Sequence, residues 1–215
     1  MPAGFVPLPL DGGGEIKCTV NQSRMRFMDI HEKEKDRLRE LIRSKSLTVG
    51  KPVTLSSGRK SDFYFDGKMV TLDAEGAYLI AHLVLDALSD VEVDAIGGLT
   101  LGADPIAATV AAVSFEHGHP INGFIVRKAS KEHGTSKQVE GGPLHPGCKV
   151  AIVEDVVTSG ASAMQAIEAV EAIGARVAKV VAIVDRLQGA EERFADAGYR
   201  FQSLFTLDDF GITTV

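Results

Sequence analysis

The sequence predicts an α/β fold in which a central parallel sheet is flanked by helices, and three observations lead to this prediction. Short apolar runs, largely β-branched, alternate with helix-forming segments from about residue 93 to residue 207. Most of these runs end in turns rich in glycine, hydroxyl or charged side chains. The 215 residues, 45 % of them hydrophobic, are enough for one domain with a sizeable core. Ligands of such a fold bind at the carboxyl ends of the strands, where the charged and glycine-rich turns fall.

The first part of the chain is expected to add an extension, a helix and two short strands. Residues 1–24 contain several prolines and three consecutive glycines, which predicts a disordered extension before a single domain over residues 25–215. Asp29 and Glu32 suit the cap and first turn of an amphipathic helix. The segments expected next are strands over 52–55 and 63–65 and a helix over 73–88.

From residue 93 onwards, strands and helices alternate. Asp104 and Pro105 suit the cap and first position of a helix, and Gly174 and Gly198 suit the ends of two others. A polar loop is expected between Val126 and Pro146. The expected strands are 93–97, 121–126, 150–153, 177–184 and 201–207, and the last two helices are 162–173 and 190–197.

Composition excludes several classes of protein. The net charge of −6 argues against a nucleic-acid-binding surface as the main function. Cys18 and Cys148 are far apart and show no CxxC spacing, which predicts a reducing compartment and no structural zinc. The first residues do not form a signal sequence, and no apolar run approaches the ~18 residues that span a bilayer. A cytoplasmic protein that does not bind membranes is expected.

The segment from Lys149 to Ser162 carries the strongest chemical signal. Its apolar strand leads into Glu154 and Asp155, then into a turn of small and hydroxyl residues that opens a helix. The carboxylates can accept hydrogen bonds from a diol, and the helix N-terminus favours an anion. A ribose 5-phosphate would satisfy both. Each half also has an ordinary interpretation, because acidic pairs form metal or receiver-type phosphorylation sites and hydroxyl residues commonly cap helices.

Four further segments add candidate residues. A basic loop after a strand, over 126–143, brings cations into an acidic protein and suits a pyrophosphate, although many such loops are only solvated. Segment 54–66 combines Arg59 and Lys60 with aromatic residues, and either a hairpin or a ligand site would use them. Segment 97–104 has glycines that allow close backbone approach, or that simply form a tight turn. Segment 185–190 places Arg186 after a strand.

These five segments, taken in order, resemble the orotate phosphoribosyltransferases, a family of type I phosphoribosyltransferases. Segment 149–162 is similar to the motif that binds phosphoribosyl pyrophosphate (PRPP), and the order R-K-x-x-K-x-H-G from Arg127 is similar to the catalytic loop. The S-G-R-K-S segment and Arg186 resemble the orotate site. The chain departs from the family at Ser56, where the family has a lysine, and at Gly102, where some members have one, so these two cationic contacts are missing or supplied elsewhere.

The resemblance implies a fold, a reaction and a set of residue roles. The type I fold has a small N-terminal hood and a mobile loop beside its central sheet. The reaction converts orotate and PRPP to orotidine 5′-monophosphate and pyrophosphate, in de novo pyrimidine biosynthesis. Mg²⁺ is held by PRPP and not directly by the protein. Residues 127–142 reach into the site of a neighbouring subunit, which implies a homodimer.

Each role falls on residues that match the motifs. Catalysis is assigned to Lys131, His133 and Asp155. Orotate is expected to contact Tyr64, Phe65, Thr158 and Arg186. PRPP is expected to contact two groups of residues, namely Arg127, Lys128, Lys131 and His133 in the loop and Glu154, Asp155, Val156, Val157, Thr158, Ser159, Gly160, Ala161 and Ser162 after the strand.

Two rival functions remain open at this point. The PRPP motif would serve a purine phosphoribosyltransferase equally well, although segments 54–66 and 185–189 favour orotate. The same fold also occurs in PRPP-sensing regulators that bind nucleic acid. The net charge of −6 and the single charged helix near the N-terminus make that second interpretation the weaker one.

Overall fold

The computed structural model describes residues 31–54, 60–128, 138–142 and 144–212. Residues 34–215 form one compact unit of the chain, and residues 1–33 form another, of which only residues 31–33 are described. The extension expected over 1–24 and the cap expected at Asp29 lie outside the described residues. No helix in the described ranges is long and apolar enough to cross a membrane.

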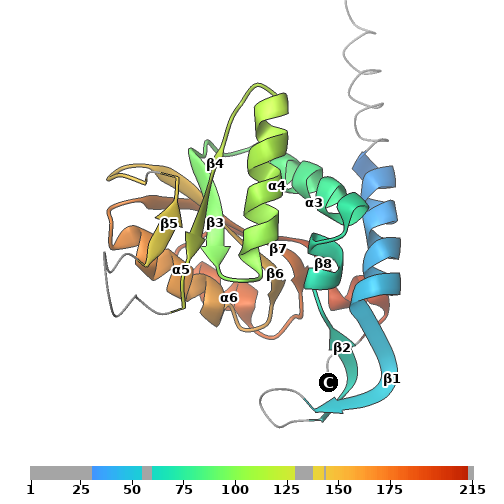
Figure 1. Ribbon diagram of the computed structural model, residues 1–215. Coiled ribbons are helices and arrows are strands. Elements are labelled where there is room, and N and C mark those ends of the chain that lie inside the picture. The colour runs from blue at the N-terminus through green and yellow to red at the C-terminus, as the bar shows by residue number, and fades with distance from the viewer. Residues whose placement is uncertain (1–30, 55–59, 129–137, 143, 213–215) are drawn as a thin grey trace, which may run out of the picture. The chain divides into compact units, whose positions relative to one another are not determined.

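A six-stranded sheet forms the centre of the compact unit, with the strand order β5-β4-β3-β6-β7-β8 (Figure 1). Five strands are parallel, and β5 pairs antiparallel with β4 at one edge. This arrangement confirms the predicted parallel sheet. The strands are β3 (Ala95–Leu99), β4 (Asn122–Val126), β5 (Val139–Gly141), β6 (Lys149–Val157), β7 (Arg176–Asp185) and β8 (Phe201–Thr206).

Helices cover both faces of this sheet, as the sequence predicts. Successive residues of β6 point to opposite faces, so Ala151 and Val153 join one buried cluster and Val150 and Ile152 join the other. The first cluster includes the apolar side chains of α3 (Ala74–Ala87) and α4 (Ala103–Glu116). The second includes those of α5 (Ala161–Glu171) and α6 (Ala190–Asp196). Because the side chains of β6 point alternately to two buried faces, its first residues after Lys149 are continuously apolar.

The N-terminal helix and a two-stranded sheet complete the unit. The helix runs over residues 31–41 and ends in a π-helical turn, Ile42–Ser46. Strands β1 (Leu47–Thr54) and β2 (Lys60–Phe65) form an antiparallel hairpin. The sequence suggested only 52–55 and 63–65, because Gly50 and Pro52 interrupt the apolar pattern. The pairing register shifts at this interruption, between Val49 and Val53.

Helix α4 begins differently from the prediction. Its N-cap is Gly102, so Pro105 is the third helical residue and not the first. Proline is tolerated there because the first N–H groups of a helix have no partner within the helix. Asp104 does not cap the helix, since its Oδ2 atom accepts a hydrogen bond from the Thr100 hydroxyl at 2.7 Å. The helix expected over 73–88 is confirmed as α3, and Asp73 caps it by accepting a hydrogen bond from the Gly76 N–H at 3.0 Å.

Candidate active site

The acidic pair lies within strand β6, not in the loop that follows it. β6 pairs with β7 as far as Val157, so the strand continues four residues beyond the Val153 end that the sequence suggested. Glu154 and Asp155 are consecutive in this strand and therefore point to opposite faces of the sheet. Glu154 lies on the α5 face, and Asp155 lies on the face covered by α4. A ligand that meets both carboxylates must cross the carboxyl end of β6.

Burial dominates the electrostatics of Glu154. Loss of water around its carboxyl raises its pKa to about 7, and the neighbouring charge of Asp155 adds to this shift. The Ser162 hydroxyl, the Ala163 backbone N–H and the charge of Lys128 act in the opposite direction. Among the described residues, none donates a hydrogen bond to the buried Oε2 atom of Glu154. A hydroxyl of a bound sugar could supply this missing donor.

Asp155 is enclosed by two glycine backbones. A Cβ atom at Gly67 would lie 2.5 Å from Asp155 Oδ2, and one at Gly102 would lie 2.4 Å from Asp155 Oδ1. Burial raises the pKa of this carboxyl, whereas the Val156 N–H, which donates to Oδ1 at 2.9 Å, and the charge of Lys68 lower it. Any side chain at position 102 would displace the Asp155 carboxylate. A lysine at position 102 would therefore require the Asp155 carboxylate to move.

The turn after β6 has the geometry of an anion site. Gly160 is the N-cap of α5 and has a left-handed backbone with φ of 76°. A Cβ atom there would also lie 2.9 Å from Phe194 Cζ. Both the left-handed backbone and the close Phe194 ring therefore favour glycine at this position. α5 begins at Ala161, and the N-terminus of a helix presents N–H groups that suit a phosphate, although the Ala163 N–H acts on Glu154. Thr158, Ser159 and Ser162 add hydroxyls beside them.

The basic loop is described only at its two ends. The N–H of Arg127 donates to the Gln138 carbonyl at 2.9 Å, and this contact extends the β4–β5 ladder to the base of the loop. The Arg127 guanidinium forms an ion pair with Glu140 at 2.9 Å. Lys128 is exposed, and its charge reaches Glu154. Lys131 and His133, both assigned to catalysis from the sequence, lie outside the described residues.

The expected orotate residues lie on strand β2 and on the turns after β6 and β7. The guanidinium of Arg186 lies over the Phe63 ring, 5.1 Å from its centroid. Its backbone N–H donates to the Val157 carbonyl at 3.0 Å, next to Thr158. Tyr64 is 41 % exposed, whereas the Phe65 ring packs against Phe210 with centroids 6.4 Å apart. The structure thus brings Arg186 to the hairpin but turns the Phe65 side chain into the core.

Sequence reasoning missed several residues that shape this region. Asp185 is buried and its Oδ1 accepts the Leu187 N–H at 2.9 Å, which holds the turn that presents Arg186. Leu187 itself has a positive φ of 54°. Gly67 and Lys68 adjoin Asp155 from a short helix, α2 (Lys68–Thr71), that the sequence did not suggest. Their signal was weak, because a Gly-Lys pair after a strand recurs by chance.

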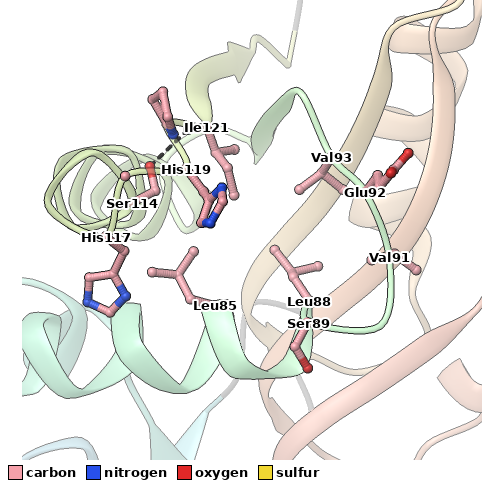
Figure 2. A pocket seen from close by; sticks show the side chains of 12 residues that line it. Leu85, Leu88, Ser89, Val91, Glu92, Val93, Ser114, His117, His119 and Ile121 are labelled. Carbon is pink, nitrogen blue, oxygen red and sulfur yellow. Dashed lines mark hydrogen bonds between the residues drawn. The ribbon is translucent and has the colours of Figure 1, made fainter. Parts of the chain in front are cut away.

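A cavity of about 590 Å³ lies elsewhere in the described unit (Figure 2). It is between the C-terminal ends of α3 and α4, and residues that line it include Leu85, Leu88, His117, His119 and Ile121. Ser114 accepts the Ile121 N–H across one wall at 2.9 Å. These segments precede β3 and β4, so the cavity is at the amino ends of the strands. It is therefore remote from the acidic pair and has none of the chemistry expected there.

Comparison with known proteins agrees with this geometry. Residues 72–203 match the model of the phosphoribosyl transferase domain. An orotate phosphoribosyltransferase of Rhodopseudomonas palustris is 49 % identical over 177 residues, which cover 81 % of this chain and 94 % of the relative. A relative of the same name from Bradyrhizobium diazoefficiens is 50 % identical with the same coverage.

The chain belongs to the orotate phosphoribosyltransferases. A solved structure of this family, the Mycobacterium tuberculosis enzyme in complex with PRPP, is 37 % identical and has a TM-score of 0.71. It covers 83 % of this chain and 99 % of its own. The same enzyme in complex with Fe(III) dicitrate is 40 % identical with a TM-score of 0.74. The type I phosphoribosyltransferase fold expected from the sequence is thus confirmed.

Proposed function

We propose that this chain transfers the phosphoribosyl group of PRPP to orotate, giving orotidine 5′-monophosphate and pyrophosphate, a step of pyrimidine biosynthesis. The observation that carries the proposal is the placement of Glu154 and Asp155 at the end of β6, with Glu154 beside the N-terminus of α5. A carboxylate pair and an anion site side by side suit a sugar diol that carries a phosphate. Relatives that share 49–50 % identity over most of the chain carry the name of this enzyme.

PRPP would lie across the carboxyl end of β6. Its 5-phosphate would bind the turn from Thr158 to Ser162, and its ribose hydroxyls would bind Glu154 and Asp155. The pyrophosphate would then face the basic loop. The cations there, which would neutralise its charge as the loop closes, are Arg127, Lys128 and Lys131, with His133.

The chemistry needs no side-chain nucleophile. The bond between ribose C1 and the pyrophosphate oxygen breaks, and the electron pair leaves with pyrophosphate. Positive charge develops on the ribosyl centre, as in glycosidic cleavage, and the carboxylates of Glu154 and Asp155 favour it. A ring nitrogen of orotate supplies the electron pair of the new bond, and the proton that this nitrogen carried passes to the departing pyrophosphate or to water. Positioning and electrostatics therefore provide most of the rate acceleration.

We place the magnesium ion mainly on the substrate, with the acidic pair beside it. The acidic pair offers hard oxygen ligands, and Mg²⁺ commonly keeps several waters and binds phosphate oxygens. When bound, Mg²⁺ would neutralise charge on the pyrophosphate. Asp155, fixed between its glycines, would hold the ribose hydroxyl beside it.

Orotate would lie between the hairpin and the turn after β7. Arg186 would bind the orotate carboxylate, since guanidinium and carboxylate groups form paired hydrogen bonds. The backbone at Tyr64 and Phe65 would border the base, and Thr158 would approach it from the phosphate side. Because the Phe65 side chain is turned into the core, its contribution would come from the main chain.

A homodimer is part of the same proposal. Ala108, Ala112 and Phe115 are exposed along one side of α4, with Phe115 75 % exposed. Leu101, at 68 % exposure, and Tyr78 of α3, at 52 %, are further exposed apolar side chains. A second copy of the chain would cover these side chains and bring its own basic loop to the neighbouring site.

Mixing two inactive variants tests the shared site. Lys131→Ala would disable the loop and Asp155→Asn would disable the diol site. If the loop acts on the neighbour's site, a heterodimer has one complete site, and activity returns in part after mixing. Absence of activity in mixed samples that contain heterodimers by mass spectrometry would mean that each site uses its own loop.

The first test of the reaction is an ultraviolet assay of orotate consumption with PRPP, with and without Mg²⁺. We expect metal-dependent loss of orotate with release of pyrophosphate. The same assay with adenine or hypoxanthine in place of orotate tests the purine alternative. If a purine is consumed and orotate is not, the chain is a purine phosphoribosyltransferase. A filter-binding assay at physiological salt tests the nucleic-acid-binding alternative.

We also propose that the protein works in the cytoplasm. The support is the cysteine usage, with only Cys18 and Cys148 in 215 residues. Cell fractionation with an antibody against the chain would test this location.

A further inference from the structure

The turn formed by Asp66, Gly67 and Lys68 packs directly against the catalytic carboxylate of Asp155. The Gly67 backbone comes so close that a Cβ atom there would lie 2.5 Å from Asp155 Oδ2. Lys68 is the next residue and the first of α2. Since consecutive Cα atoms are about 3.8 Å apart, its side chain starts beside Asp155.

The ammonium of Lys68 is held by a partner on the same turn. Its Nζ atom lies 2.6 Å from Asp66 Oδ1, and the side chain is 48 % exposed. The backbone N–H of Lys68 also donates to Asp66 Oδ1 at 3.1 Å. An ion pair this exposed contributes little to stability and exchanges readily with other anions. The ammonium is therefore available to a ligand.

The charges of this turn act on the carboxyl that we place against the ribose. Lys68 lowers the pKa of Asp155, whereas Asp66 raises it. Gly102 also borders Asp155, and a Cβ atom there would lie 2.4 Å from Oδ1, so a side chain at this position would displace the carboxylate. Gly67, on one side of Asp155, is followed by the cation Lys68. Gly102 itself brings no positive charge to this carboxylate.

We propose that Lys68 is a further substrate-binding residue, whose ammonium leaves Asp66 and binds the pyrophosphate of PRPP. The proposal rests on the proposed placement of PRPP. In that placement the 5-phosphate occupies the α5 turn, and the pyrophosphate leaves C1 on the side of the ribose hydroxyls, where Asp155 and Lys68 lie. Asp66 stabilises the ammonium when PRPP is absent, and the pyrophosphate replaces it when PRPP binds.

Calorimetry with three probes tests this role. PRPP with Mg²⁺, pyrophosphate with Mg²⁺ and ribose 5-phosphate are titrated into the full chain and into the variants Lys68→Gln and Lys68→Arg. We expect Lys68→Gln to weaken PRPP and pyrophosphate by about tenfold or more, since it removes a charge-assisted hydrogen bond. Ribose 5-phosphate, which lacks the pyrophosphate, should bind as before. Lys68→Arg should retain most of the affinity.

Lys149→Gln is a matched control. Lys149 is also half exposed and paired with a carboxylate, at 2.8 Å from Glu92, but it lies at the amino end of β6. PRPP affinity should be unchanged in this variant.

Two outcomes would overturn the assignment of Lys68 in different ways. Lys68 does not bind the pyrophosphate if Lys68→Gln binds PRPP within twofold of the affinity of the unmodified chain. The same conclusion follows if the variant loses equal affinity for ribose 5-phosphate and for PRPP. If the unmodified chain binds neither PRPP nor ribose 5-phosphate, the placement of PRPP is wrong, and the role proposed for Lys68 is wrong as well. Melting temperatures of all variants identify any loss that comes from unfolding.

Discussion

Glu154 and Asp155 are neighbours in β6, yet their carboxylates lie on opposite faces of the central sheet. Glu154 is beside the N-terminus of α5, where Ser162 and Ala163 act on it. Asp155 fits between Gly67 and Gly102. The two carboxylates are therefore not interchangeable. Glu154 belongs with the phosphate turn, and Asp155 belongs with the turns that we place near the pyrophosphate.

Asp155→Asn should weaken PRPP binding by about 10- to 100-fold, because an amide cannot replace the charge and the second acceptor of the carboxylate. The volume of the side chain is unchanged, so Gly67 and Gly102 still fit. Isothermal titration calorimetry with PRPP and Mg²⁺ measures the effect, and Asp196→Asn at the exposed end of α6 is the control. If Asp155→Asn binds PRPP with unaltered affinity, Asp155 does not bind the ribose hydroxyls.

The pKa of Glu154, raised to about 7 by burial, predicts a pH-dependent stability. The folded chain holds a proton that the unfolded chain releases, so this carboxyl makes folding less favourable as pH rises from about 4.5 to about 7. Glu154→Gln removes this effect. At pH 8, without ligand, we expect the variant to be more stable than the unmodified chain by about 1–3 kcal/mol.

Urea unfolding at pH 4.5 and pH 8 measures the difference. The gain should be largest at pH 8 and should vanish at the lower pH. The same variant should lose PRPP affinity at pH 8, where the unmodified chain carries the charged form. A stability difference that is equal at both pH values would contradict the raised pKa.

The sequence was sufficient for the sheet, its two helical layers and the location of the site. Strand β6 shows why, since a run of apolar residues buried on both faces has few other interpretations. It was insufficient for β5, whose three residues pair at a sheet edge within a polar loop and bury little. Pro105 misplaced the start of α4 by two residues, because proline is accepted throughout the first turn of a helix.

The sequence predicted which residue types form the site, but not where their side chains point. Glu154 and Asp155 are adjacent in the sequence, but the sequence did not show that β6 extends to Val157 and so places their carboxylates on different faces. It also could not indicate that Gly67 and Gly102, 35 positions apart, enclose the same carboxylate. Such contacts depend on tertiary packing, and a glycine gives no sequence signal about what approaches it.

Gly102→Ala should lower kcat/KM for PRPP by about 10- to 100-fold, because the added methyl group would force the Asp155 carboxylate out of position. Steady-state kinetics measure the loss. Gly123→Ala is the matched control in β4, where the nearest atom to a new Cβ would be the Ala107 carbonyl oxygen at 3.6 Å. Equal activity in the two variants would mean that Asp155 can move without consequence.

Asp185→Ala should raise KM for orotate by about tenfold while KM for PRPP changes little. The variant removes the acceptor for the Leu187 N–H and so loosens the turn that presents Arg186. Asp185→Asn retains an oxygen at this place and should keep most of the orotate affinity. An equal rise in both KM values would point to a general loss of structure, and a melting temperature would reveal it.

Lys131→Ala should lower kcat by orders of magnitude while PRPP still binds. Lys131 belongs to a loop whose base is closed by the Arg127–Gln138 contact, and its motif assigns it to the leaving pyrophosphate. Charge supplied there stabilises the transition state more than the bound substrate, so the loss should appear mainly in kcat, with PRPP binding modest but still present. Single-turnover kinetics with calorimetry separate the two quantities. Lys137→Ala in the same loop lies outside the matched R-K-x-x-K-x-H-G order and is the control. Unchanged turnover in Lys131→Ala would show that the loop has been assigned to the wrong role.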